Sequence, residues 1–285
     1  MFVDKTISEE VLRIADQHPI HGRFGRSYYP KLFDNRAAVA SEKAGSAIIA
    51  SSGPEGIDFY GAPALIIGSD VDAIGGLIDG LPRGKVRAIC ASDIDLQKIG
   101  FHSSPRHSLV ADLRGGETEL HRGLRKSFRS LVNWGRKNIR QVFVNRDNPD
   151  QTAFGEYQDL HARVSGRQTR PQSSWDAMFQ WIAQGGGELA LGYMDTIGLV
   201  ASTLVVDGTE ASFYASGAYD RDHFDKPLSH WPVYSAMLRS ADRGMKFFDF
   251  GTLPDAEAPK KERDIAHFKR GFSANVETRP EWIRQ

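Results

Sequence analysis

The sequence predicts an α/β (α+β) protein of two consecutive domains, each a mixed, largely antiparallel sheet flanked by helices. The first observation is length, because 285 residues exceed one average domain and suffice for two. The second is that short apolar strand-like runs alternate with segments of helical periodicity in both halves. The third is composition: 40% hydrophobic and 25% charged residues describe an ordinary globular protein.

In the first half, three candidate strands precede a helix and a further strand. The strand-like runs are GSAIIAS, GIDFYG, APALIIG and, after the helix, KVRAICA. The helix is expected from Asp70 to Leu81, with Asp70 or Ser69 as its N-terminal cap. Upstream, His21 to Asp34 mixes cations with aromatics and could line a ligand surface or form an irregular surface segment.

The second half reads helix, helix, three strands, helix, strand, helix, strand. The polar turn RDNPDQ places the domain boundary near Asn148, giving domains 1–148 and 149–285, with a final strand that could pack back on the first domain. The ranges expected are helices 152–165 and 174–183, strands 188–194, 197–207 and 210–220, and a helix that begins near Ser229 or Pro232 and ends at Gly244.

A basic segment stands out between these halves. From His121 to Arg140 there is no acidic residue. The cations recur at spacings of three and four, so one face of a helix would carry nearly all of them. Like charges at these spacings repel one another. We therefore expect one amphipathic helix whose stripe faces phosphates, with a solvated or internally paired face as the alternative. Its cations are Arg122, Arg125, Lys126, Arg129, Arg136, Lys137 and Arg140, and its apolar face is Leu120, Leu124, Phe128 and Leu131.

The stretch from Met245 to Phe272 carries the remaining candidates. In its strand FFDFG, the period of two places Phe248 and Phe250 on one face and Asp249 on the other, among apolar neighbours. An ionised carboxylate there needs a partner, so Asp249 is either a structural hydrogen-bond acceptor or a site residue. Behind it, Gly251 would let the backbone approach a ligand closely.

Lys269 lies between aromatic residues in HFKRGF, where a fully solvated lysine is not expected. A lysine held there could donate to a carbonyl or a phosphate. Together, the FDFG strand, the variable loop and the FK-x-GF segment resemble the C-terminal end of FemABX transferases, a branch of the GNAT acyltransferase superfamily. The basic segment and the element order of the second half also resemble that family, over most of residues 100–285.

The resemblance implies two tandem GNAT-like domains and transfer of an aminoacyl group from tRNA to an amine of a phosphate-bearing acceptor, such as a peptidoglycan precursor. It implies that Lys269, beside Phe268, stabilises an oxyanion or holds the donor, with Asp249 as a further catalytic candidate. No tightly bound cofactor is implied. The candidate substrate-binding residues are Arg122, Arg125, Lys126, Arg129, Arg136, Tyr214, Gly251 and Arg270.

One departure bears on the donor. After the strand ending at Asp220, the chain reads Arg221, Asp222, His223, Phe224, without the glycine pattern that GNAT enzymes use to hold coenzyme A. Acyl-CoA-dependent N-acylation is therefore the alternative prediction for the function, behind transfer from aminoacyl-tRNA. A noncatalytic protein that binds RNA or an anionic glycan through the basic stripe is a third reading.

Other site types find little support in the sequence. Lys and Arg balance Asp and Glu at 36 each, so net charge makes no case for nucleic acid. The single cysteine, Cys90, lies in an apolar run and is expected in the core. His102 and His107 have no acid at metal-ligand spacing. Without a signal-like start or a run of about 20 apolar residues, we expect a cytoplasmic protein with no membrane span.

Overall fold

The computed structural model describes residues 37–43, 45–53, 56–58, 63–90, 93–208 and 210–285. The cationic and aromatic segment His21 to Asp34 lies outside them. By its internal contacts the chain forms two compact units: unit 1 comprises the chain up to Arg106 and Thr278–Gln285, and unit 2 comprises His107–Glu277. The chain passes from one unit to the other within strand β6 (His102–Asp112) and again within strand β12 (Val276–Arg284).

In the described part of unit 1, strands pack around helix α2 (Val71–Asp79). Strand β5 runs parallel to β3 and β4 and antiparallel to the end of β12, with Trp282 opposite Ala88. Strand β2 pairs antiparallel with β1, β3 and β4. The elements are β1 (Ala37–Lys43), β2 (Ser46–Gly53), β3 (Gly56–Asp58), β4 (Ala64–Ile67), α2 (Val71–Asp79), β5 (Val86–Cys90) and a 3-10 turn at Gln97–Ile99.

The helix of unit 1 is fixed at its start by the expected cap. The Asp70 carboxylate accepts hydrogen bonds from the backbone N–H groups of Asp72 and Ala73, each at 3.0 Å. Ile74 and Ile78 of α2 and Trp282 of β12 share one apolar cluster with the strands. Cys90, expected in the core, is half-buried at the edge of that cluster.

Unit 2 follows the element order that the sequence predicts for the second half. The elements are α3 (Gly116–Gly123), α4 (Lys126–Asn138), β7 (Arg140–Val144), α5 (Gln151–Ser165), α6 (Gln172–Ala183), β8 (Gly187–Met194), β9 (Gly198–Asp207), β10 (Ala211–Tyr219), a 3-10 turn at Arg221–His223, α7 (His230–Asp242), β11 (Phe247–Thr252) and α8 (Lys260–Lys269). Asp150 caps α5, its carboxylate accepting from the Ala153 N–H at 3.0 Å.

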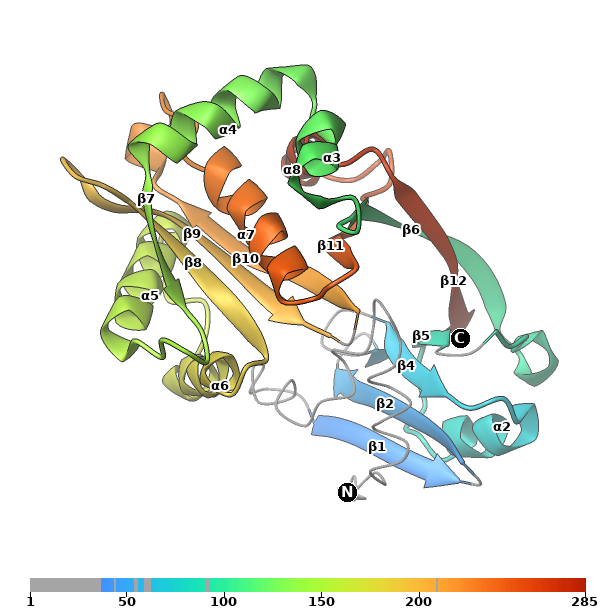
Figure 1. The fold of residues 1–285 in the computed structure, drawn as a ribbon. Coiled ribbons are helices and arrows are strands. Elements are labelled where there is room, and N and C mark those ends of the chain that lie inside the picture. The colour runs from blue at the N-terminus through green and yellow to red at the C-terminus, as the bar shows by residue number, and fades with distance from the viewer. Residues whose placement is uncertain (1–36, 44, 54–55, 59–62, 91–92, 209) are drawn as a thin grey trace. The chain divides into compact units, whose positions relative to one another are not determined.

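The sheet of unit 2 has the order β6–β11–β10–β9–β8–β7. Strands β10 and β11 run parallel, whereas β6–β11, β10–β9, β9–β8 and β8–β7 are antiparallel pairs. Helices α4 and α7 cover one face, and α5 and α6 lie on the other (Figure 1). Phe248 and Phe250 point into the same core cluster, so the predicted faces of β11 are confirmed.

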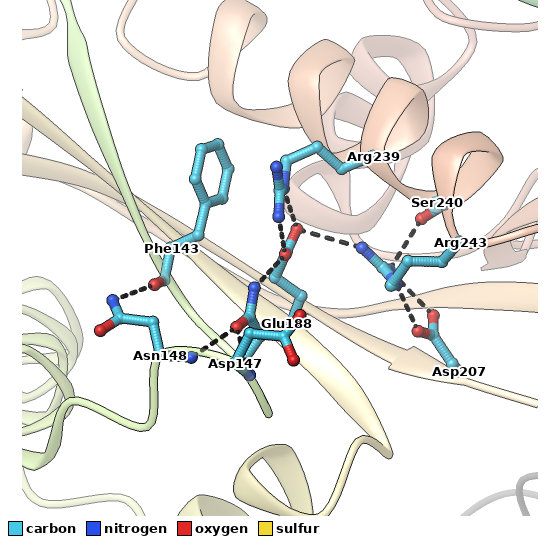
Figure 2. A network of polar contacts seen from close by, with 9 residues as sticks. Phe143, Asp147, Asn148, Glu188, Asp207, Arg239, Ser240 and Arg243 are labelled. Carbon is cyan, nitrogen blue, oxygen red and sulfur yellow. Dashed lines mark hydrogen bonds and ion pairs between the residues drawn. The ribbon is translucent and has the colours of Figure 1, made fainter.

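A buried ionic network ties α7 to the sheet. The Glu188 carboxylate on β8 lies between Arg239 and Arg243 of α7, and Arg243 also reaches Asp207 on β9 (Figure 2). The Nε atoms of Arg239 and Arg243 lie 2.6 Å and 2.7 Å from their carboxylate acceptors. Burial raises the pKa of Glu188, but the hydrogen bonds from Arg239 and Asn145 and the charges of Arg243 and Arg239 together outweigh that effect and leave the pKa below its ordinary value.

The predicted single basic helix is wrong, because two helices meet at Leu124. Leu124 and Arg125 have extended backbone, with ψ of 143° and 136°. The break lets the Arg125 N–H donate to the Gly271 carbonyl at 2.9 Å and seats the Phe128 ring over Gly271, where a Cβ would lie 2.0 Å from that ring.

Two further differences concern β6 and the division of the chain. No strand is among those expected from the sequence where β6 lies, because Pro105 and the polar residues before Leu109 conceal it. The sequence places a boundary near Asn148, whereas the units divide at Arg106 and again at Glu277. The reason is that β7 pairs antiparallel with β8, which assigns the basic helices to unit 2.

Candidate functional site

The candidate site lies in unit 2, where the parallel strands β10 and β11 part. They pair at Ala211–Phe247, Ser212–Phe248 and Phe213–Asp249. Directly beyond, each strand carries a register irregularity against its other neighbour, at Tyr214/Ser216 in β10 and at Asp249/Gly251 in β11. Past this point backbone groups of the two strands no longer bond each other, and they are free to meet a side chain or a ligand.

Lys269, the last residue of α8, occupies this point. Its Nζ donates to the Phe250 carbonyl oxygen at 2.5 Å and lies 5.4 Å from the centroid of the Tyr214 ring. Burial lowers the pKa of Lys269, and Asp249 opposes that change. An ammonium has three N–H donors, so Lys269 keeps donors for a ligand after bonding Phe250.

Asp249 shapes the strand from within. It is 1% exposed, and its Oδ1 accepts from the Gly251 N–H at 2.6 Å. Gly251 has φ of 89°, a conformation that side chains with a Cβ rarely adopt. The structural hydrogen bond anticipated for Asp249 is therefore present, and it fixes the irregularity that brings the Phe250 carbonyl to Lys269.

Two tyrosines line the same place on β10. The Tyr214 and Tyr219 hydroxyls lie 3.1 Å apart, and Tyr219 is 3.1 Å from Thr203 Oγ1. Burial raises the pKa of Tyr219 to about 12 and that of Tyr214 well above its ordinary value, so both stay neutral and able to donate. Gly217 makes room for them, since a Cβ there would lie 2.2 Å from the Tyr214 hydroxyl.

The basic residues are less available to a ligand than the sequence suggests. Arg122 pairs with Glu119, and Arg136 pairs with Glu117 and stacks over a tryptophan. Both glutamates lie in α3, just before residues 121–140, which contain no acidic residue. These pairs match the alternative of an internally paired face, and binding of phosphates by this face stays a prediction.

The remaining cations lie around the start of α4 and the end of α8. Arg125 donates to the His267 carbonyl at 3.0 Å, and Arg129 donates to the Arg122 carbonyl at 2.6 Å. Lys126 and Arg270 are exposed. These cations lie in one region of unit 2. Within the part of the chain that the structure describes, none of them forms a hydrogen bond with Lys269.

Phe268 belongs to an aromatic cluster instead of facing the site alone. Its ring lies 5.8 Å from Phe128 and 5.2 Å from Phe272, and the His230 ring is 5.5 Å away. Burial lowers the pKa of His230 to about 4, so its imidazole is neutral. The cluster anchors the end of α8 and thereby the position of Lys269.

Comparison with solved structures gives the fold. FemX aligns over 98% of this chain and 96% of its own, with 14% identity and a TM-score of 0.65. The chain has a FemX-like fold. The C-terminal domain of a protein from Agrobacterium fabrum assigned as a lysylphosphatidylglycerol synthetase aligns over 97% of this chain and 92% of its own (13% identity, TM-score 0.64). L-PGS from Bacillus licheniformis aligns over 97% and 91% (10% identity, TM-score 0.61).

The predicted α/β fold class, a mixed sheet flanked by helices, is confirmed and matches the fold of FemX. No family model and no curated protein sequence matches the chain. Within the described residues, no helix is long and apolar enough to cross a membrane, and no group of three ligating side chains could hold a metal ion.

Sequence reasoning did not identify three polar residues close to this site. Tyr157 and Arg170 lie on α5 and on the loop before α6, and Ser216 lies at the irregularity of β10. Only the unusual arginine content of the loop GRQTRPQ hinted at them. The burial of Tyr157 is a tertiary property, because α5 packs against β9 and β10.

Proposed function

We propose that this protein is a transferase that moves an aminoacyl or acyl group from a carrier ester onto an amine. The observation that carries the proposal is Lys269, a largely desolvated ammonium held where β10 and β11 part in a FemX-like fold. In the proposed reaction the amine nitrogen bonds the carbonyl carbon and the carbon–oxygen bond of the ester breaks. The amine proton passes to the leaving oxygen.

Lys269 would act on the oxyanion that develops at the carbonyl oxygen. A charge in a water-poor site interacts more strongly than in water, and Lys269 is already positioned by its bond to Phe250. The neutral Tyr214 hydroxyl, which shares a hydrogen bond with that of Tyr219, lines the same place. Asp249 has a positioning role in this proposal, because it fixes the carbonyl to which Lys269 is bonded.

The turn after β10 supports an ester carrier such as aminoacyl-tRNA over acyl-CoA. There the Asp220 carboxylate accepts from the Asp222 N–H at 3.2 Å and faces His223 Nδ1 at 3.2 Å. A carboxylate in this position occupies a backbone donor and repels a pyrophosphate. The cations of α3 and α4 would contact phosphates of the carrier or acceptor, and a peptidoglycan precursor is one acceptor to test.

The experiment uses radiolabelled aminoacyl-tRNAs and acyl-CoAs, each with a panel of amines that includes a peptidoglycan precursor. We expect transfer from the ester donor. Lys269→Met should lower turnover at least about 100-fold, the loss typical of removing one oxyanion donor. Lys261→Met, an exposed lysine of the same helix, is the control. Transfer from neither donor class would overturn the proposal, and full turnover by Lys269→Met would remove that residue from the mechanism.

A further inference from the structure

A group of buried polar atoms lies on the face of the unit 2 sheet that α5 and α6 cover. Tyr157 on α5 is fully buried, at 0% exposure, and its hydroxyl makes no hydrogen bond of acceptable geometry. Nη1 of Arg170 is buried and unpartnered as well. An unpaired buried polar group destabilises the fold, so two neighbouring examples require an explanation.

Both side chains are held in place by aromatic packing. The Arg170 guanidinium lies 5.1 Å from the centroid of the Trp175 ring. Trp175 is 4% exposed and packs edge-on against Tyr157, with centroids 5.5 Å apart and an interplanar angle of 89°. The guanidinium and the phenol are therefore preorganised before any ligand binds.

The polar groups around Tyr157 offer more hydrogen-bond donors than acceptors. Burial raises the pKa of Tyr157, whereas the charge of Arg170 and side-chain hydrogen bonding with Ser216 and Arg170 lower it. Both residues therefore lie near its hydroxyl, although neither forms a hydrogen bond of acceptable geometry with it. A guanidinium only donates, and each hydroxyl has a proton that needs an acceptor. Across the described residues no carboxylate forms an ion pair with Arg170. The missing component is an acceptor with negative charge.

The group adjoins the site of Lys269 through the tyrosines of β10. Tyr157 contributes to raising the pKa of both Tyr214 and Tyr219. The Tyr214 hydroxyl is 3.1 Å from that of Tyr219, and its ring is 5.4 Å from Lys269 Nζ. Ser216 lies beyond the last residue pair that β10 shares with β11. The group around Tyr157 therefore lies next to the tyrosines that line the point where the strands part.

We infer that Tyr157, Arg170 and Ser216 form a binding site for a carboxylate carried by the substrate. A single guanidinium beside two hydroxyls matches a planar, monoanionic carboxylate, to which arginine can donate two parallel hydrogen bonds. The substrate class is accordingly an amine that also bears a carboxylate, such as an amino acid or a peptide. The statement that the carboxylate belongs to the amine acceptor rests on the proposed function, whereas the statement that the site binds a carboxylate does not.

The test compares glycylglycine with glycylglycine amide, which differ in the carboxylate, by quenching of tryptophan fluorescence. Trp175 beside Arg170 is the reporter. The free acid should bind at least about tenfold tighter than the amide, as expected for one hydrogen bond to a charged group. Arg170→Met should abolish that preference, and Arg167→Met, an exposed arginine of the same loop, should retain it.

Tyr157→Phe separates binding from folding. It removes a hydroxyl that lacks a partner in the unbound protein, so we expect Tm to stay equal or rise while affinity for the acid falls. The inference is overturned if the wild type binds acid and amide equally, or neither at millimolar concentration, or if Arg167→Met and Arg170→Met weaken binding alike. None of these readings requires turnover, so failure of the transfer assay with selective acid binding would refute the proposed function alone.

Discussion

Glu188→Gln tests whether the buried network on α7 stabilises unit 2. The Glu188 side chain is 3% exposed and accepts hydrogen bonds from Arg239 Nε (2.6 Å), Arg239 Nη2 (2.5 Å), Arg243 Nη1 (3.1 Å) and Asn145 Nδ2 (2.8 Å). The substitution keeps the shape of the side chain but removes its charge. Arg243 then keeps Asp207 as a carboxylate partner in this network, whereas Arg239 keeps none.

Removing one partner of a buried ion pair costs about 3 to 5 kcal/mol. The Arg239 and Arg243 side chains are 35% and 26% exposed, so water recovers part of the loss. We therefore take about 3 kcal/mol, the lower end, after discounting for solvent screening. For a domain of this size that corresponds to a fall in Tm of about 6 to 12 °C.

The pH dependence gives an independent check. Because the pKa of Glu188 is lowered in the folded protein, its contribution is present above the unfolded pKa and is lost as pH falls through the folded pKa. The Tm difference between wild type and Glu188→Gln should be full at neutral pH and shrink below about pH 4.3, the ordinary value for glutamate.

Differential scanning calorimetry from neutral to acidic pH measures both effects. Glu257→Gln, at an exposed position on the loop before α8, is the control and should leave Tm unchanged. A Glu188→Gln Tm within about 2 °C of wild type at neutral pH would refute the reasoning, since it would mean that the network contributes under 1 kcal/mol.

Two other outcomes follow from the surroundings of single residues. Gly217→Ala should lower the free energy of unfolding by about 1 to 3 kcal/mol, because the added Cβ would lie 2.2 Å from the Tyr214 hydroxyl. Urea titration measures this free energy. The control is Gly155→Ala, because a Cβ at Gly155 meets nothing within 4 Å. Burial raises the pKa of Cys90 to about 12, so we expect little alkylation by iodoacetamide at neutral pH in native protein and rapid alkylation in denaturant, read by mass spectrometry. Equal rates in both conditions would contradict that expectation.

Local signals in the sequence were sufficient for most elements of unit 2. Helix α5 begins after the Asp150 cap and ends at Gly166, which has φ of 70°, so its limits are set by residues adjacent in sequence. The period of two along β11 likewise determines which side chains enter the core. These features need no knowledge of distant contacts.

What the sequence could not predict depends on contacts between distant residues. The break at Leu124 accompanies contacts of Arg125 and Phe128 with Gly271, far along the chain. Lys269 could be selected as a candidate from its aromatic neighbours, but its bond to Phe250 depends on the irregularity that Asp249 and Gly251 produce. No sequence pattern marks the convergence of Tyr157 and Arg170.

The path of the chain through unit 1 has a consequence for synthesis on the ribosome. Unit 1 takes its last segment, Thr278–Gln285, from beyond unit 2, and Trp282 of that segment is 5% exposed within the apolar cluster of α2 and β5. Domains usually fold in the order in which they are translated. Here all of unit 2 has been translated before unit 1 receives its closing strand, so the nascent chain holds an incomplete N-terminal unit, and its apolar cluster is completed last.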